Sequence, residues 1–271
     1  MKFCSAIIPL ALALTASNAS ASVIYNEDFS GFTTGNIDGQ SGWNVSGSST
    51  TAFEIVDGGL SYSNGDVSHQ GGSQNVKANT GGNEFAAFVN FGSRSDDELY
   101  FSFLFNPNEN FFLVGLTEGS ISGGGVNPAG GAARFNQENS RGRLFDSSSN
   151  NSEFGDIASG SNILYVGKIS KSVSGAGENY DTMSFMVNPD SLVEGGGSNT
   201  WTNIGSTFDT GLSSLDTFYF RGPNETGDHG IDMLRVGTTF GDVVVPEPST
   251  YAGIFGFVAL GFVVSRRKFS E

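Results

Sequence analysis

The strongest constraint on the fold is the spacing of apolar residues in short stretches. In residues 99–105, Leu99, Phe101, Phe103 and Phe105 occupy every second position, which places their side chains on one face of an extended strand. Between such stretches the chain is rich in small and polar residues, and its 39 glycines are unfavourable inside helices. The pattern therefore predicts an all-β fold with no amphipathic helix of useful length.

Other segments have the same character and are expected to form strands. The clearer ones are residues 84–90, 111–116, 162–170, 183–187, 217–221 and 231–236, and the weaker ones are 23–25, 51–56 and 60–62. Roughly ten to thirteen strands separated by polar turns indicate an antiparallel β-sandwich or jelly roll. The 24 phenylalanines can fill its core without disulfides. Residues 22–244 are therefore interpreted as one domain, with long loops at 118–132 and 194–199.

The residues that follow this domain have a different pattern. Pro246 and Pro248 flank Glu247, and each proline fixes φ and lacks a backbone donor, so the tripeptide is predicted to be extended and exposed. Residues 251–264 carry no charge. This run of about 14 residues is predicted to form a short transmembrane helix, which rises roughly 20 Å and so is shorter than the ~30 Å hydrocarbon core. Three basic residues, which favour a cytoplasmic location, follow the apolar run: Arg266, Arg267 and Lys268.

Taken in this order, residues 245–271 resemble the PEP-CTERM sorting signal of Gram-negative bacteria. The resemblance implies recognition by an exosortase, a membrane-embedded cysteine protease that cuts near the motif. The protein would then pass from an inner-membrane intermediate to the cell surface or the exopolysaccharide matrix. The alternative is an ordinary tail anchor after a proline linker. The module is also labelled an ice-binding protein C-terminal domain, but the threonines here are scattered, whereas ice binding needs a regular array.

The first residues predict export by the same route. Lys2 precedes an apolar run at residues 7–14, and Ala19 and Ala21 form the small-x-small site that signal peptidase accepts. Residues 1–21 are therefore expected to be a signal peptide. The single cysteine, Cys4, lies inside it. The mature protein would then have no disulfide, no thiolate metal site and no cysteine nucleophile.

The charge of the exported body limits its partners. Four of the 13 basic and two of the 28 acidic residues lie in the two targeting segments, which leaves the body with a formal charge of about −17. Such a field repels nucleic acid and anionic lipid surfaces. Divalent cations and neutral glycans remain compatible with it.

Two stretches of the body resemble a group of bacterial PEP-CTERM proteins with a concanavalin A-like (laminin-G-like) jelly roll. One is residues 27–32 leading to 39–43, with Trp43 at its end; the other is residues 230–243, which look like the final strand of that group. The resemblance implies that the first and last strands lie side by side at one sheet edge. It also makes calcium a possible ligand, because calcium is common among concanavalin A-like domains.

Catalytic patterns are weak in this chain. Glucanases on this fold carry carboxylates at alternate strand positions, whereas Asp96, Asp97 and Glu98 are consecutive and read as a charged turn. His69 and His229 are flanked by glycines and polar residues, so both are expected in loops, and no Gly-x-Ser-x-Gly elbow accompanies them. The favoured interpretation is a non-catalytic surface or matrix protein. A diverged polysaccharide-active enzyme, or display without any ligand, stays open as an alternative.

Two binding sites are predicted on weaker grounds. Asn224, Asp228 and Asp232 offer oxygen ligands near the last strand and could bind Ca²⁺, although no cofactor is required; otherwise Asp228 forms a turn and Asp232 makes hydrogen bonds at a strand end. Trp201 follows a glycine-rich loop and could stack on a sugar of an exopolysaccharide, or could simply pack against the body.

Overall fold

The computed structural model describes residues 23–46, 52–78, 85–107, 112–121, 128–136, 139–146, 150–156, 161–175, 177–204, 208–222 and 229–245. The predicted signal peptide, with its cleavage residues Ala19 and Ala21, and the tail from Pro246 onward lie outside them. Within the described ranges, no helix has the length and hydropathy needed to cross a membrane. These ranges form strands and one helix of five residues, so the prediction of an all-β fold is confirmed.

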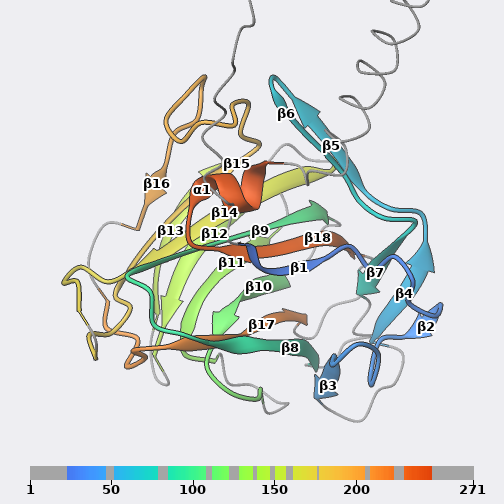
Figure 1. Ribbon diagram of the computed structural model, residues 1–271, viewed down its shortest axis with the longest axis horizontal. Helices are drawn as coiled ribbons and strands as arrows, with labels where there is room; N and C mark the ends of the chain where they lie inside the picture. The colour runs from blue at the N-terminus through green and yellow to red at the C-terminus, as the bar shows by residue number, and fades with distance from the viewer. Residues whose placement is uncertain are drawn as a thin grey trace, which may run out of the picture.

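Two antiparallel sheets pack face to face as a jelly-roll sandwich (Figure 1). The first sheet has the order β16-β15-β14-β9-β18-β7-β4-β2, and β1 also pairs with β18. Its strands are β1 (Val23–Glu27), β2 (Gly35–Asn36), β4 (Phe53–Asp57), β7 (Gln74–Ala78), β9 (Glu98–Asn106), β14 (Ile163–Ser170), β15 (Thr182–Val187), β16 (Thr202–Asn203) and β18 (His229–Gly237).

The second sheet has the order β13-β12-β11-β10-β17-β8-β3. Its strands are β3 (Asn44–Ser46), β8 (Phe85–Arg94), β10 (Phe112–Thr117), β11 (Gly130–Asn136), β12 (Asn139–Phe145), β13 (Asn150–Asp156) and β17 (Leu215–Gly222). A hairpin of β5 (Ser61–Asn64) and β6 (Val67–Gln70) and the helix α1 (Phe240–Val244) complete the fold. All the strand predictions of the sequence correspond to strands here.

The main core lies between the two sheets and is dominated by aromatic rings. The predicted face of β9 is confirmed, because Leu99, Phe101, Phe103 and Phe105 all point into this core and are fully buried. Phe105 packs on Phe135 of the second sheet with ring centroids 4.2 Å apart. Aromatic pairs at such distances add ~0.5–1.5 kcal/mol to the burial of their area, which explains how a cysteine-free sandwich is held together.

A second layer covers the outer face of the first sheet. There α1 and the β5–β6 hairpin pack on β9 and β14, and both lie on the same side of the sheet in Figure 1. The cluster includes Tyr100 and Leu104 of β9 and Leu164 and Val166 of β14. Because both faces of β9 and β14 are buried, these strands read as nearly continuous apolar runs rather than as an alternation of apolar and polar residues.

The last strand differs from expectation in its place in the sheet. β1 pairs with β18 as expected, but β18 lies inside the sheet, between β9 and β7, and not at an edge. A bulge between Asp232 and Arg235, with Met233 at φ 52°, lets β7 pair with the first part of β18 and β1 with the last part. The strand itself was predicted at residues 231–236 and is confirmed as His229–Gly237.

Helix α1 follows β18 and begins with a capping box. The Thr239 side chain accepts a hydrogen bond from the Asp242 backbone N–H, and the Asp242 carboxylate accepts one from the Thr239 N–H at 2.9 Å. Such a reciprocal pair satisfies two backbone donors that would otherwise lack partners at a helix start. The long loop predicted at 118–132 is too long, since residues 130–132 belong to β11.

Candidate functional site

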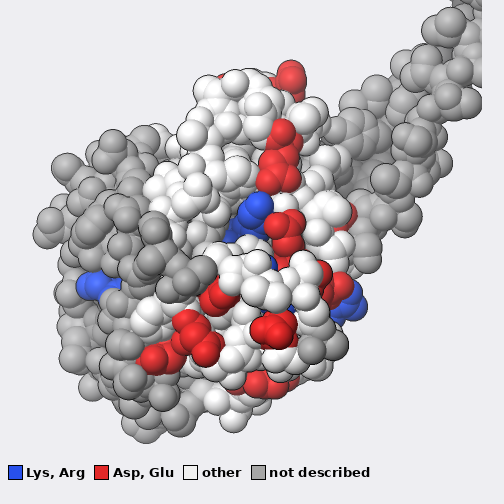
Figure 2. Space-filling view, turned by 90° about the vertical axis from the view of Figure 1, so that its left-hand side faces the viewer, with Lys and Arg blue, Asp and Glu red and all other residues white. Residues whose placement is uncertain are grey.

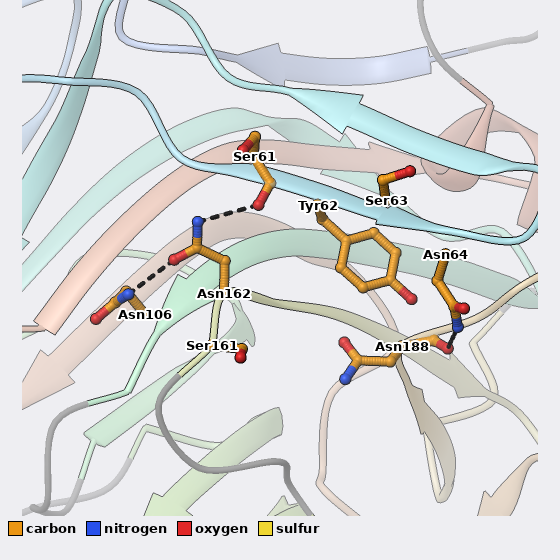
Figure 3. A pocket seen from close by; sticks show the side chains of 8 residues that line it. All are labelled: Ser61, Tyr62, Ser63, Asn64, Asn106, Ser161, Asn162 and Asn188. Carbon is orange, nitrogen blue, oxygen red and sulfur yellow. Dashed lines mark hydrogen bonds between the residues drawn. The ribbon is translucent and has the colours of Figure 1, made fainter.

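A polar hollow of about 570 Å³ opens beside the β5–β6 hairpin (Figure 3). Four segments of the chain meet there: strand β5, the end of β9, the start of β14 and the end of β15. The described residues that line it are Ser61, Tyr62, Ser63, Asn64, Asn106, Ser161, Asn162 and Asn188. Tyr62 is the one aromatic residue among them, and none carries a charge at neutral pH. We call this site the polar hollow.

Asn188 is fixed at the wall of the polar hollow by β14. Its backbone N–H donates to the Leu164 carbonyl at 2.8 Å, and its side-chain Oδ1 accepts from the Leu164 N–H at 3.1 Å. Asn188 has φ 56°, a left-handed conformation that asparagine tolerates better than most residues. No bond within the described residues uses its Nδ2, and the side chain points into the hollow in Figure 3. This N–H₂ group is therefore available to a ligand.

The opposite wall is a chain of amide bonds. Asn106 donates through Nδ2 to Asn162 Oδ1 at 2.7 Å, and Asn162 donates in turn to the Ser61 carbonyl at 3.0 Å (Figure 3). These bonds orient both side chains and leave Asn106 Oδ1 without a described protein partner. This wall therefore holds two amide side chains in fixed orientations.

The hairpin is docked onto the segment after β15, which holds the polar hollow in shape. Tyr62 donates its hydroxyl to the Pro189 carbonyl at 2.9 Å, and Asp66 donates its N–H to the Asp190 carbonyl at 2.8 Å. Gly65 allows this contact, because a Cβ there would lie 2.2 Å from the Asp190 oxygen. Burial raises the pKa of Tyr62 to about 12, so the phenol stays protonated and remains a donor at neutral pH.

Trp201 belongs to a different cluster, on the outer face of the first sheet. It is half-buried against Tyr100 and Phe240, with ring centroids 6.2 and 6.1 Å away, and its Nε1 donates to Glu194 at 2.9 Å. Lys168 Nζ lies 5.3 Å from its ring. These contacts fit the alternative role for Trp201, which is packing against the body. Stacking on a sugar ring stays a prediction.

Two carboxylates meet in this cluster, which the sequence did not reveal because they are distant in the chain. Glu98 and Glu194 both lie within hydrogen-bond distance of the Tyr100 hydroxyl, at 3.2 and 3.3 Å. Both also pair with Lys168, at 3.6 and 3.7 Å. The same lysine and the same hydroxyl therefore face both carboxylates, and Glu194 also accepts from Trp201 Nε1.

The predicted metal ligands are only partly described. Asn224 and Asp228 lie outside the described residues, so the calcium set stays a prediction. Asp232 is fully buried within β18, where its carboxylate accepts from the N–H groups of Leu60 and Met233, each at 2.8 Å. Burial raises its pKa to about 7, and the charges of Asp28 and Glu27 act in the same direction. In the described ranges no group of three His, Cys, Asp or Glu residues could hold a metal ion.

Both histidines were expected in loops, and this prediction is wrong. His69 lies in β6 and His229 begins β18, and both are almost completely buried. The His229 ring packs 5.0 Å from Phe112, and His69 Nε2 lies 2.7 Å from the Val244 carbonyl. Neither histidine is among the residues of the polar hollow. Of the expected charged turn, Asp96 and Asp97 lie between β8 and β9, whereas Glu98 is the first residue of β9.

Comparison with known proteins gives one family match. The model of the PEP-CTERM protein-sorting motif matches residues 244–268, which include all six predicted motif residues: Pro246, Glu247, Pro248, Arg266, Arg267 and Lys268. No curated protein matches the chain.

Three solved structures illustrate the likeness of the fold. A sialidase aligns with 12% identity over 81% of this chain and 19% of its own length, with a TM-score of 0.46. The T. cruzi calreticulin globular domain aligns with 12% identity over 80% of this chain and 89% of its own length, with a TM-score of 0.44. The VIP36 exoplasmic/lumenal domain in its Ca²⁺/Man3GlcNAc-bound form gives 9% identity, 74% and 87% coverage, and a TM-score of 0.41.

The structural likenesses are distant, and the fold is read from the strand pairing described above. The sorting motif, in contrast, is a direct match to the sequence and implies processing by an exosortase. The chain is therefore an exported jelly-roll β-sandwich protein that carries a PEP-CTERM protein-sorting motif at residues 244–268.

Proposed function

We propose that the protein is a non-catalytic surface or matrix protein that binds a neutral glycan in the polar hollow. The observation that carries this proposal is the lining of the hollow by amides, hydroxyls and one phenol, with no charged side chain among the described residues. Sugar hydroxyls both donate and accept hydrogen bonds, so they match a surface that presents both kinds of group. The sorting motif supports the location, since it directs the protein out of the cell.

The acidic body favours a neutral ligand over an acidic one. Its formal charge of about −17 repels uronate or sulfate groups, whereas it leaves an uncharged sugar unaffected. Acidic side chains are spread over the face shown in Figure 2, with few basic ones among them, rather than gathered in one cleft. Spread acids fit a binding or structural protein better than a glycosidase, which needs two carboxylates at a fixed separation.

The expected affinity per site is low. Hydrogen bonds to a ligand contribute a net ~0.5–1.5 kcal/mol each, so a handful of them correspond to a Kd on the order of 1 mM. Weak single sites suit a protein held at high density on a surface or in a matrix, because several sites engage one polysaccharide at once.

The test is a glycan-array screen of the full chain in detergent, with and without calcium, together with an assay for released sugars. Asn188→Asp keeps the oxygen that accepts from Leu164 and replaces the Nδ2 donor, so we expect it to weaken retention of the bound glycan about tenfold or more. Asn44→Asp, an equal charge change on an exposed strand residue, is the matched control. Equal binding by wild type and Asn188→Asp would contradict the proposal.

The same screen decides between the alternatives. Released sugars would support a diverged enzyme, and Glu194→Gln would then identify the Glu98–Glu194 pair as its carboxylates. Retention that needs calcium would support the predicted ligands Asn224, Asp228 and Asp232. A protein that binds no glycan, with or without calcium, would be one displayed without a ligand.

A further inference from the structure

The backbone just before Pro246 is held by three side chains from three different strands. Ser102 Oγ of β9 donates to the Val243 carbonyl at 2.7 Å, and His69 Nε2 of β6 donates to the Val244 carbonyl at 2.7 Å. Arg235 Nη1 of β18 donates to the Val245 carbonyl. We call these three side chains the C-terminal clamp. All three are buried, with 2% exposure or less.

The C-terminal clamp meets a need that α1 cannot meet by itself. The last four carbonyls of a helix have no partner within the helix, and α1 has no basic residue in its last turn. At many helix ends these carbonyls accept hydrogen bonds from water or from the backbone of a glycine turn. Here buried side chains of the β-sandwich donate to three consecutive carbonyls, those of Val243, Val244 and Val245. Because a carbonyl can only accept, His69 must carry its proton on Nε2, and Nδ1 has no described partner.

Apolar burial reinforces these bonds. Val243 and Val244 are fully buried and Phe240 nearly so, and all three pack in the cluster on the outer face of the first sheet. Residues 240–245 are therefore part of the folded body rather than a linker. The family match begins at residue 244, so its first two residues lie inside the fold.

We propose that the C-terminal clamp sets the limit of proteolytic processing, so that the cut falls at or beyond the Pro246–Glu247 bond. A protease must reach the carbonyl carbon of the bond that it cuts, and the carbonyls of the three preceding peptide bonds are engaged by Ser102, His69 and Arg235. Hydrolysis adds one water across the cut bond, leaving a carboxylate on the mature protein and an amine on the released peptide. The mature protein would keep α1 and Val245.

This proposal rests on the sorting motif and not on glycan binding, so the two can fail separately. The first test is the intact mass and the C-terminal peptide of the processed protein, produced from the full chain in a host with an active exosortase. We expect a mature C-terminus at Pro246 or later. A mature C-terminus at Val245 or earlier would overturn the proposal.

A second test uses a protease with broad specificity on the full chain in detergent, with cut positions read by mass spectrometry. Cuts in wild type should spare residues 240–245. Ser102→Ala removes one hydrogen bond of the C-terminal clamp. The fraction of molecules in which residues 240–245 are locally unfolded should then rise about fivefold, and new cuts should fall inside this segment. Ser184→Ala is the matched control, because that hydroxyl bonds only the Asn203 side chain on the neighbouring strand.

A variant at the histidine separates the bond from general packing. His69→Gln keeps an N–H donor that can reach the Val244 carbonyl and should protect residues 240–245 better than His69→Leu does. If Ser102→Ala and Ser184→Ala were cut at the same positions and rates, or if His69→Gln and His69→Leu did not differ, the proposed role of the C-terminal clamp would be wrong.

Discussion

His69 and Arg235 hold the adjacent carbonyl oxygens of Val244 and Val245 at the end of α1. The guanidinium is permanently charged, and burial together with this neighbouring charge lowers the pKa of His69 to about 4. The histidine is therefore neutral at neutral pH and works as a single-proton donor. A second positive charge here would face Arg235 in a buried site.

The first prediction concerns acid stability. Between pH 4 and the ordinary histidine value of 6.5, the unfolded chain binds a proton that the folded protein does not bind. The free energy of unfolding should therefore fall as pH drops through this window, by about 3 kcal/mol from this residue. His69→Gln should remove this contribution. Urea unfolding of residues 22–246, followed by the fluorescence of buried Trp43, measures it; an unchanged slope in the variant would refute the assignment.

The second prediction concerns Asp232, whose contribution to the free energy of unfolding changes with pH in the opposite direction. Asp232 has a folded pKa raised from 3.8 to about 7, mainly by burial and also by the charges of Glu27 and Asp28. The folded protein holds a proton that the unfolded chain has lost, so this contribution is present below pH 3.8 and disappears as pH rises through 7, by about 4 kcal/mol. Asp232→Asn should remove this contribution, so that the free energy of unfolding of the variant rises with pH because of His69. The measurement is the free energy of unfolding of wild type and of Asp232→Asn at pH 4.5 and 7.5.

The third prediction tests the docking of the hairpin. Gly65→Ala would place a Cβ 2.2 Å from the Asp190 carbonyl oxygen at φ +54°. Gly31→Ala, at φ +92° with nothing within 4 Å, introduces only backbone strain and is the control. We expect Gly65→Ala to cost about 2–3 kcal/mol and the control about 1 kcal/mol. Equal losses, or unchanged glycan retention by Gly65→Ala, would show that the hairpin does not shape the polar hollow.

The fourth prediction concerns the aromatic core. The Phe105 ring packs on the rings of Phe135 and Phe112, with centroids 4.2 and 5.7 Å away. Phe105→Ala would therefore leave a cavity between the two sheets. The expected cost is about 3–5 kcal/mol. Val173→Ala, at a side chain that is 60% exposed, should change the free energy of unfolding by about 0.5 kcal/mol or less. Thermal or urea unfolding of both variants decides whether the rings stabilise the sandwich in this way.

The sequence predicted the parts of the fold that depend on local pattern. The strands β9 and β14 follow from their spacing of apolar residues, and the sorting motif is linear and needs no structure to be read. Some glycines suggest a turn in the sequence but serve close packing in the fold. A Cβ at Gly131 would lie 2.5 Å from Ile169 Cδ1, so this glycine belongs in β11 rather than in a loop.

Neighbouring glycines also explain why both histidines were wrongly predicted to lie in loops. A Cβ added at Gly71, near His69, would lie 1.9 Å from Asp232 Oδ2. A Cβ added at Gly230, next to His229, would lie 3.2 Å from the Asn106 Cβ. Both glycines permit close approach of strands and do not mark turns. The polar hollow could not be predicted, because Asn188 and Ser61 are far apart in the chain and meet only when the hairpin docks.

The most direct test of the proposed function is a titration of residues 22–246 with the glycan retained in the array screen, followed by the side-chain amide signals in NMR spectra. Binding in the polar hollow should shift the Asn188 and Asn106 amides first and leave the Trp201 indole signal unchanged. Shifts confined to Trp201 and its neighbours, or absent at Asn188, would contradict the account.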